Sequence, residues 1–188
     1  GDYFMDFEHY RAAAECYRNA DLPQRMAHAR ALAAEKVKDF ETAAGWWDKA
    51  GEPRRAAEDY ERAGKQGLAL PIWQKLGEQE RAEDCRLLLL EEEGHFAEAA
   101  TAREKRKEYE KAIENWRKAG CYDREAKLWE KLKNPAKAVQ AYVKARDFQS
   151  AAKLYLKLRR KEDAARCLED GGRFAAAMDL WRKLKMPD

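Results

Sequence analysis

The sequence lacks long apolar runs and close cysteine pairs, and each absence removes a class of protein. A membrane-spanning helix requires about 20 apolar residues, and no apolar run in the sequence comes near that length, so membrane insertion is not expected. The four cysteines lie far apart without a CxxC pair, which excludes zinc ribbons and thioredoxin-like sites. Scattered thiols in a chain that can build a core without disulfides predict a reducing intracellular compartment, the cytoplasm.

Catalytic and cofactor motifs are also missing. The histidines His9, His28 and His95 have no neighbours at metal-ligand spacing, and the glycines form neither a dinucleotide-binding pattern nor a P-loop. No GxSxG nucleophile elbow occurs. The sequence therefore predicts no catalytic, cofactor-binding or metal-binding residue, and no enzymatic activity for this chain.

Charge is abundant and unevenly distributed. The chain is 39% charged, yet its six Trp, eight Tyr and six Phe argue for a packed core rather than disorder. Residues 1–94 hold 14 Lys and Arg against 20 Asp and Glu, whereas residues 95–188 hold 24 against 15. Such an asymmetry can steer a charged partner or govern how copies associate, so self-association is left open. The sequence pI of about 8.6 is too mild to indicate nucleic acid by itself.

The strongest feature is a short internal repeat of constant length. Alanines recur in two series at the same interval, which is the distance from Ala43 to Ala56. The first series begins with these two residues, and the second begins with Ala99 and Ala112. A large aromatic side chain usually follows each alanine by four residues, and positions separated by three and four residues share one face of a helix. Glycines follow the apolar stripes, as is typical of the C-terminal ends of helices. The residues typical of N-terminal caps precede the stripes, namely Asp39, Asn134 and Asp147.

This repeat predicts an all-α fold in which about thirteen short antiparallel helices stack as a right-handed α-α superhelix, an α-solenoid. The helices are expected to begin near residues 3, 23, 40, 53, 66, 79, 96, 108, 122, 135, 148, 161 and 174. Additional residues near 87–94 break the register, so the helix from residue 79 is expected to run to about Glu93. The break separates two stacks, 1–94 and 95–188, within one solenoid spanning 1–188. The chain begins without Met and ends on an apolar stripe, which predicts a fragment of a larger multidomain protein whose catalytic part could lie elsewhere.

Several segments resemble the second helix of a tetratricopeptide repeat. They share its aromatic, alanine, aromatic and alanine positions, as in 40–51, 109–120 and 148–155. The unit of two helices, which is the interval from Phe96 to Tyr122, is shorter than the unit of that family. In this respect the chain is also similar to the compact hairpins of clathrin-type and coatomer-type solenoids. The resemblance implies protein–protein interaction, and it supplies no catalytic residues.

The residue patterns favour a non-catalytic scaffold that binds a protein or peptide partner, an acidic one if the basic residues take part. Trp46 lies beside the buried stripe and is a candidate contact residue. Basic residues at the helix ends of the C-terminal half are expected to form a ridge along one edge: Lys131, Lys133, Lys144, Arg146, Lys157, Arg159, Arg160 and Lys161. The alternative is binding of RNA or another polyanion along this ridge, which the interspersed acids disfavour.

Overall fold

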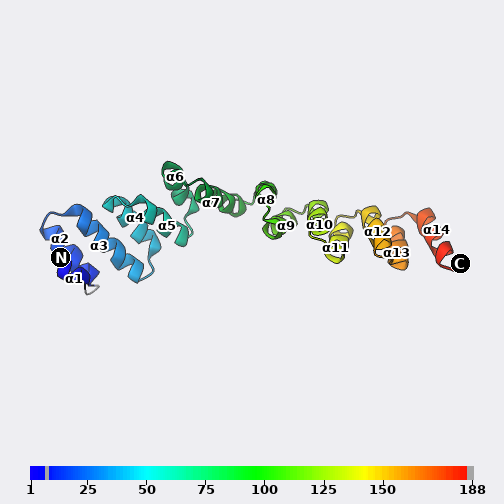
Figure 1. Cartoon of the computed structure of the whole chain (residues 1–188), viewed down its shortest axis with the longest axis horizontal. Coiled ribbons are helices and arrows are strands. Elements are labelled where there is room, and N and C mark those ends of the chain that lie inside the picture. The colour runs from blue at the N-terminus through cyan, green and yellow to red at the C-terminus, as the bar shows by residue number, and fades with distance from the viewer. Residues whose placement is uncertain (7–8, 186–188) are drawn as a thin grey trace. The chain divides into compact units, whose positions relative to one another are not determined.

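A computed structural model shows an all-α protein, and it describes residues 1–6 and 9–185. These residues contain fourteen helices and no strand (Figure 1). The first seven helices are α1 (Asp2–Asp6), α2 (Tyr10–Asn19), α3 (Pro23–Lys36), α4 (Phe40–Ala50), α5 (Pro53–Arg62), α6 (Gln66–Lys75) and α7 (Gln79–Glu92). The other seven are α8 (Phe96–Lys105), α9 (Tyr109–Lys118), α10 (Tyr122–Lys131), α11 (Pro135–Lys144), α12 (Phe148–Lys157), α13 (Lys161–Asp170) and α14 (Phe174–Lys185).

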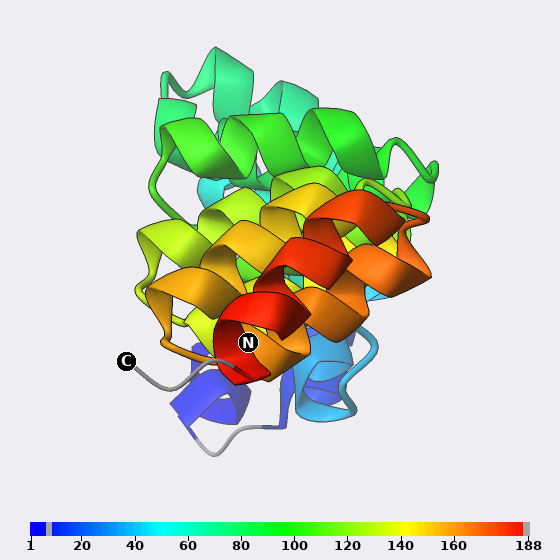
Figure 2. The same cartoon turned by 90° about the vertical axis from the view of Figure 1, so that its right-hand side faces the viewer.

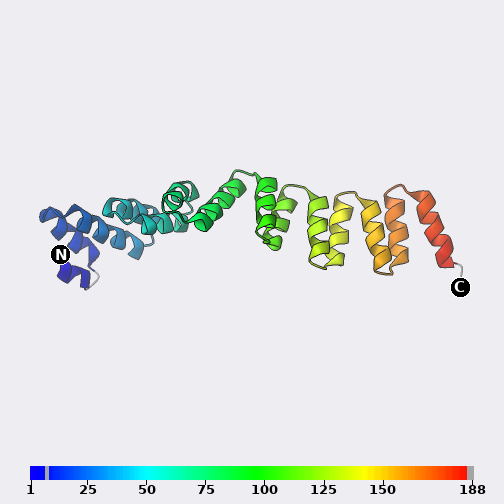
Figure 3. The same ribbon diagram turned by 45° about the horizontal axis from the view of Figure 1, so that its top comes forward.

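The chain divides into two compact units, Gly1–Glu93 and Gly94–Asp188. Within each unit every helix packs against its neighbours in sequence, which is the packing of an α-solenoid. The second unit shows this simply, because its links alternate between two opposite edges (Figure 3). Seen from the C-terminal end, α14 is the outermost helix of this unit, with α13 next to it (Figure 2).

The predicted helix caps are confirmed. Asp39, Asn134 and Asp147 each accept a hydrogen bond from the backbone N–H three residues later, at 3.2, 3.2 and 3.0 Å. The six glycines that follow apolar stripes all have positive φ, between 71° and 81°, as a left-handed residue after a helix requires. At other helix ends the same conformation is held by a lysine or arginine, namely Lys38, Lys107, Lys133, Arg146 and Arg159.

The alanine series forms the core, as predicted. Every alanine of the two series is at most 8% exposed, so adjacent backbones approach closely. Trp47 and Trp73 are fully buried, and Trp116 is 7% exposed. The stacked small residues bring each helix against the next, and the aromatic side chains fill the space between them. Helices of about ten residues are marginal alone, so this packing accounts for their stability.

The structure corrects the prediction at the N-terminus and agrees with it at the register break. One helix was expected from about residue 3, but α1 and α2 are separate. The Tyr17 hydroxyl donates to Asp2 at 2.5 Å, and Phe4 and Met5 pack against the alanines of α2 and α3, so α1 folds back rather than continuing. Around the break, α7 spans 14 residues against ten in α6 and α8, and it ends one residue before Glu93.

Candidate interaction surfaces

The polar tips of several large aromatic residues are hydrogen-bonded inside the protein in a recurring arrangement. The indole N–H of Trp73 donates to Glu61 at 2.7 Å, and that of Trp181 donates to Glu169 at 2.8 Å. In both pairs the acceptor lies 12 residues before the aromatic residue. The same spacing joins Trp47 to Glu35, Trp116 to Glu104 and Tyr142 to Glu130.

A cation eight residues after the aromatic residue covers its ring. Arg55 lies 4.6 Å from the centre of the Trp47 ring, and Lys137 lies 4.3 Å from that of Trp129. The same arrangement joins Arg25 to Tyr17, Arg81 to Trp73 and Arg124 to Trp116. Cation–π contacts of this kind stabilise a folded protein by about 0.5–2 kcal/mol each. These aromatic residues therefore belong to the packing of the repeat rather than to a binding surface.

Among the tryptophans of the repeat, Trp129 departs from this arrangement, and two exchanged residues explain how. At the position before Trp129 where the other tryptophans of the repeat have glutamate, the chain has Arg117, and the position expected to hold an alanine is Glu125. Glu125 Oε1 accepts from Trp129 Nε1 at 3.2 Å and from Arg117 Nε and Nη2 at 3.1 and 2.5 Å. The Glu125 residue is only 4% exposed. The carboxylate that serves the tryptophan has thus moved to another position, where an arginine compensates its burial.

Glu35 and Asp59 form a carboxyl pair around Trp47. The indole N–H lies 3.3 Å from Glu35 Oε1 and 3.0 Å from Asp59 Oδ2, and Arg62 reaches Asp59 at 2.9 Å. Burial and the neighbouring Asp59 carboxylate raise the pKa of Glu35 above its ordinary value. A carboxyl group whose pKa is raised by burial can serve as a general acid. Asp59, however, is 0% exposed, so it cannot contact a substrate, and the pair is part of the core.

This pair makes the stability of the first unit depend on pH. A carboxyl group whose pKa is higher in the folded state stabilises it at low pH, and this contribution is lost as the pH rises through the folded pKa. Glu35→Gln keeps a hydrogen-bonding oxygen for Trp47 and removes the charge. We expect it to raise the melting midpoint of the first unit at about pH 8 and to leave it nearly unchanged at about pH 4. Thermal unfolding followed by circular dichroism at both pH values tests this. An equal change at both would contradict it.

Trp46 lines a surface hollow of about 330 Å³ between α2, α3 and α4. Its ring is partly buried against the core and is contacted by two cations, Arg30 at 4.6 Å and Lys49 at 4.3 Å from the ring centre. Arg30 also lies 3.8 Å from Glu15 in the same hollow. The structure thus places Trp46 at an accessible surface of the first unit, and its role in binding a partner stays a prediction.

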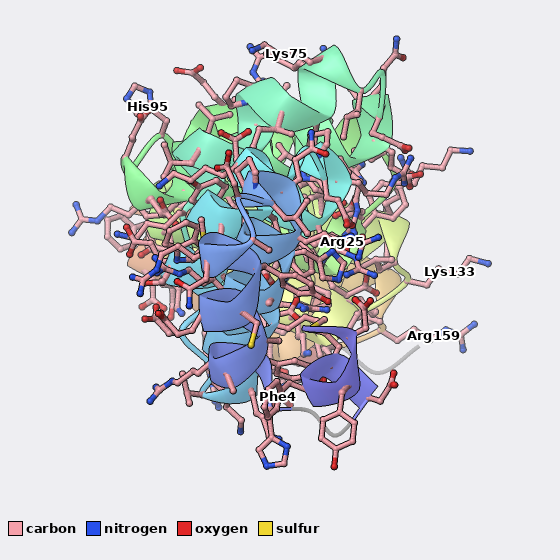
Figure 4. The ribbon with its side chains drawn as sticks, turned by 90° about the vertical axis from the view of Figure 1, so that its left-hand side faces the viewer. Phe4, Arg25, Lys75, His95, Lys133 and Arg159 are labelled. Carbon is pink, nitrogen blue, oxygen red and sulfur yellow. The ribbon has the colours of Figure 1, made fainter. Side chains whose placement is uncertain are left out.

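A second hollow, of about 400 Å³, lies where α1 meets α2 and α3. Among the side chains that line it, Asp2, Tyr17, Arg25 and His28 are engaged with one another or with a nearby residue. Asp2 accepts from Tyr17 at 2.5 Å and lies 3.4 Å from Arg25, while the His28 ring lies 2.9 Å from Glu52. Figure 4 shows Arg25 and Phe4 in this unit. Because these contacts already engage most of the polar side chains that line the hollow, we assign it no ligand.

The eight basic residues predicted to form one ridge are all exposed, but they do not lie along a single edge. Lys144 lies over the Tyr122 ring, so the end of α11 meets the start of α10, and the two helices are antiparallel. Consecutive links therefore fall on opposite edges of the second unit (Figure 3). Lys144 and Arg146 lie on one edge. The other six lie on the opposite edge, namely Lys131, Lys133, Lys157, Arg159, Arg160 and Lys161.

This alternation separates charge within the second unit. We call the edge formed by residues 102–112, 128–138 and 154–164 the basic edge, because these residues hold 12 Lys and Arg against 6 Asp and Glu. The opposite edge, formed by residues 115–125, 141–151 and 167–177, holds 6 against 5. In Figure 4, Lys133 and Arg159 extend from one side, and His95, at the start of α8, extends from the other. The positive charge of the second unit is thus concentrated on one edge.

The acids of the basic edge are largely engaged within the protein. Glu108 pairs with Arg103 and Arg106 at 2.8 Å, and Asp163 pairs with Arg160 at 2.7 Å. Several cations of this edge are exposed and make no ion pair or ring contact within residues 1–6 and 9–185, namely Lys107, Lys133, Lys157, Arg159 and Lys161. The charge that stays unpaired on the basic edge is therefore mainly positive.

Residues 1–6 and 9–185 contain no group of three His, Cys, Asp or Glu side chains placed to hold a metal ion. The same residues contain no helix with the length and apolarity needed to cross a bilayer. All four cysteines are free thiols, and burial, together with Glu61, raises the pKa of Cys85 to about 12, which leaves this thiol unreactive.

Comparison with known proteins gives no family assignment. No known family matches the chain, and no curated protein is similar to it. The helical repeat is therefore supported by the packing of the structure, and the likeness to tetratricopeptide repeats remains a resemblance of residues.

Proposed function

We propose that this chain is a non-catalytic scaffold that binds a partner protein through the surface of its helical repeats. The observation that carries this proposal is the separation of roles within the repeat. Alanines and large aromatic residues are used for packing, and neighbouring helices supply partners to the polar tips and ring faces of most of the tryptophans. The buried carboxyl groups serve the same packing. What the repeats present outward is an extended surface of charged side chains with surface hollows in the first unit.

The free, partly buried thiols support placing the scaffold in a reducing compartment such as the cytoplasm. Repeat proteins of this kind offer long surfaces on which binding residues can vary without disturbing the core. The comparison with tetratricopeptide repeats, which bind proteins, enters this proposal through the aromatic and alanine positions that resemble that family.

The proposed function is tested by native affinity purification from the source cells. Each recovered protein is then expressed alone and titrated with the purified chain in a calorimeter. The proposal expects at least one protein that binds saturably with fixed stoichiometry and a negative heat-capacity change, which marks burial of apolar surface. It is contradicted if no recovered protein binds in purified form, or if the chain turns over a small-molecule substrate.

A further inference from the structure

We infer that the basic edge of the second unit binds an acidic, leucine-bearing segment of a partner protein. The inference rests on the proposed scaffold function and adds the binding face and the chemistry of the partner. Lys107, Lys133 and Arg159 carry it, because they occupy the same turn position in successive hairpins and face solvent on the same edge.

These three side chains stand where the backbone favours glycine. Their φ values are 63°, 55° and 59°, in the left-handed region that disfavours residues with a Cβ atom. The chain uses glycine at six equivalent helix ends, so glycine is compatible with this turn. A cation near a helix C-terminus does interact favourably with the helix dipole. That benefit is equally available on the opposite edge, where Gly120 and Gly172 occupy two of the three turns.

The edge is spaced for a partner segment rather than for a single ion. Successive cationic turns are separated by two helices, which corresponds to about 16–20 Å at ordinary helix-packing distances. A segment that reaches all three turns must span about 32–40 Å, which a helix of about 24 residues does. Acidic side chains on such a segment can pair with those cations of the basic edge that take no part in the internal ion pairs.

Apolar side chains accompany the cations and favour a protein partner over RNA. Leu156 and Leu158 are 39% and 38% exposed beside Lys157 and Arg159. The opposite edge also exposes apolar side chains, Val143 at 39% and Phe174 at 64%, so the choice of the basic edge rests on its charge, and the exposed leucines bear only on the chemistry of the partner. Binding of single-stranded RNA draws on aromatic rings that stack with bases. Every aromatic residue of the basic edge already contacts a cation: Tyr109 with Lys131, Trp129 with Lys137, and Tyr155 with Arg160.

The test uses the whole chain and three labelled probes in fluorescence anisotropy at 150 mM salt. The first probe is a 24-residue peptide of Glu, Asp and Leu, the second replaces each Leu with Ser, and the third is a uridine 24-mer. The inference expects saturable binding of the leucine peptide with Kd below about 100 µM. Binding of the serine peptide is expected to be at least about threefold weaker, because the exposed leucines then lose their contacts.

Two pairs of charge reversals of equal size identify the edge. Lys133→Glu with Arg159→Glu is expected to weaken binding of the leucine peptide about tenfold or more, because it places like charges opposite each other. Arg146→Glu with Arg173→Glu changes the opposite edge by the same charge, and we expect an effect within about twofold. Circular dichroism of both variants checks that they fold.

A glycine pair keeps the test independent of folding. Lys133→Gly with Arg159→Gly relieves the left-handed strain, so the melting midpoint is expected to be preserved or raised while binding falls. Equal weakening by both charge-reversal pairs, or tighter binding of the uridine oligomer than of the leucine peptide, overturns the inference. Absence of saturable peptide binding overturns it as well. If a purified partner protein binds the Lys133→Glu, Arg159→Glu variant as tightly as the parent, the scaffold function stands and this face is wrong.

Discussion

Replacing Trp47 with alanine is expected to destabilise the first unit by about 3–5 kcal/mol, the range for truncating a large buried aromatic residue. The Trp47 side chain is fully buried among Ala31, Ala34, Ala43 and Ala56. Small neighbours cannot expand to refill the space, so the cavity remains. The substitution also removes the N–H that donates to the buried Asp59 carboxylate at 3.0 Å, which leaves that oxygen without this donor.

Hydrogen exchange measured by mass spectrometry locates the effect. We expect faster exchange in α3, α4 and α5, because each helix is held by its neighbours, and little change in α9 to α13. Trp47→Phe is the matched control, since it keeps most of the ring and removes the N–H. Its effect is expected to be smaller, about 1–3 kcal/mol. Parent-like unfolding of Trp47→Ala would mean that Trp47 does not hold the three helices together.

The helices and their core could be predicted from the sequence because both follow local spacing. The alanine period, the aromatic residue four positions later and the glycine after each stripe all act within one helix or at its end. Each was found where the spacing placed it, at Ala112, Trp116 and Gly120 for instance. The prediction of a single N-terminal helix was wrong. The separation of α1 from α2 goes with a contact between Asp2 and Tyr17, 15 residues apart, which no local period encodes.

The single basic ridge was wrong for a different reason. Each step of the alanine series advances by one helix, whereas an edge of an antiparallel stack recurs only at every second helix, so Arg146 falls opposite Lys133 and Arg159. The spacing of Phe96, Tyr122, Phe148 and Phe174, which is two such steps, already contained this information. The hydrogen bonds from several aromatic side chains to a glutamate of the preceding helix were missed as well, although Glu61, Glu104, Glu130 and Glu169 stand at one position of the repeat.

Arg117 and Glu125 depart from this pattern, and replacing Arg117 is expected to give the second large loss of stability. Arg117→Ala is expected to destabilise the second unit by about 3 kcal/mol, at the lower end for breaking a buried ion pair, because the arginine side chain is itself about half exposed. The Glu125 carboxylate is buried, and its Oε2 atom has no partner within the described residues. Loss of Arg117 leaves Trp129 Nε1, at 3.2 Å from Oε1, as its remaining side-chain donor.

A double substitution tests whether the two residues compensate each other. Arg117→Glu alone places two carboxylates together and is expected to be the least stable variant. Adding Glu125→Ala restores the common repeat, with an alanine in the core and a glutamate at the usual position before Trp129, and is expected to return stability to within about 1 kcal/mol of the parent. Urea unfolding of the parent, both single variants and the double variant gives the coupling energy. Effects that simply add, within about 0.5 kcal/mol, would show that the Arg117→Glu substitution does not supply a carboxylate partner for Trp129 in place of Glu125. A double variant as stable as the parent shows that the repeat tolerates both positions for the carboxylate, because each brings an oxygen to the same indole N–H.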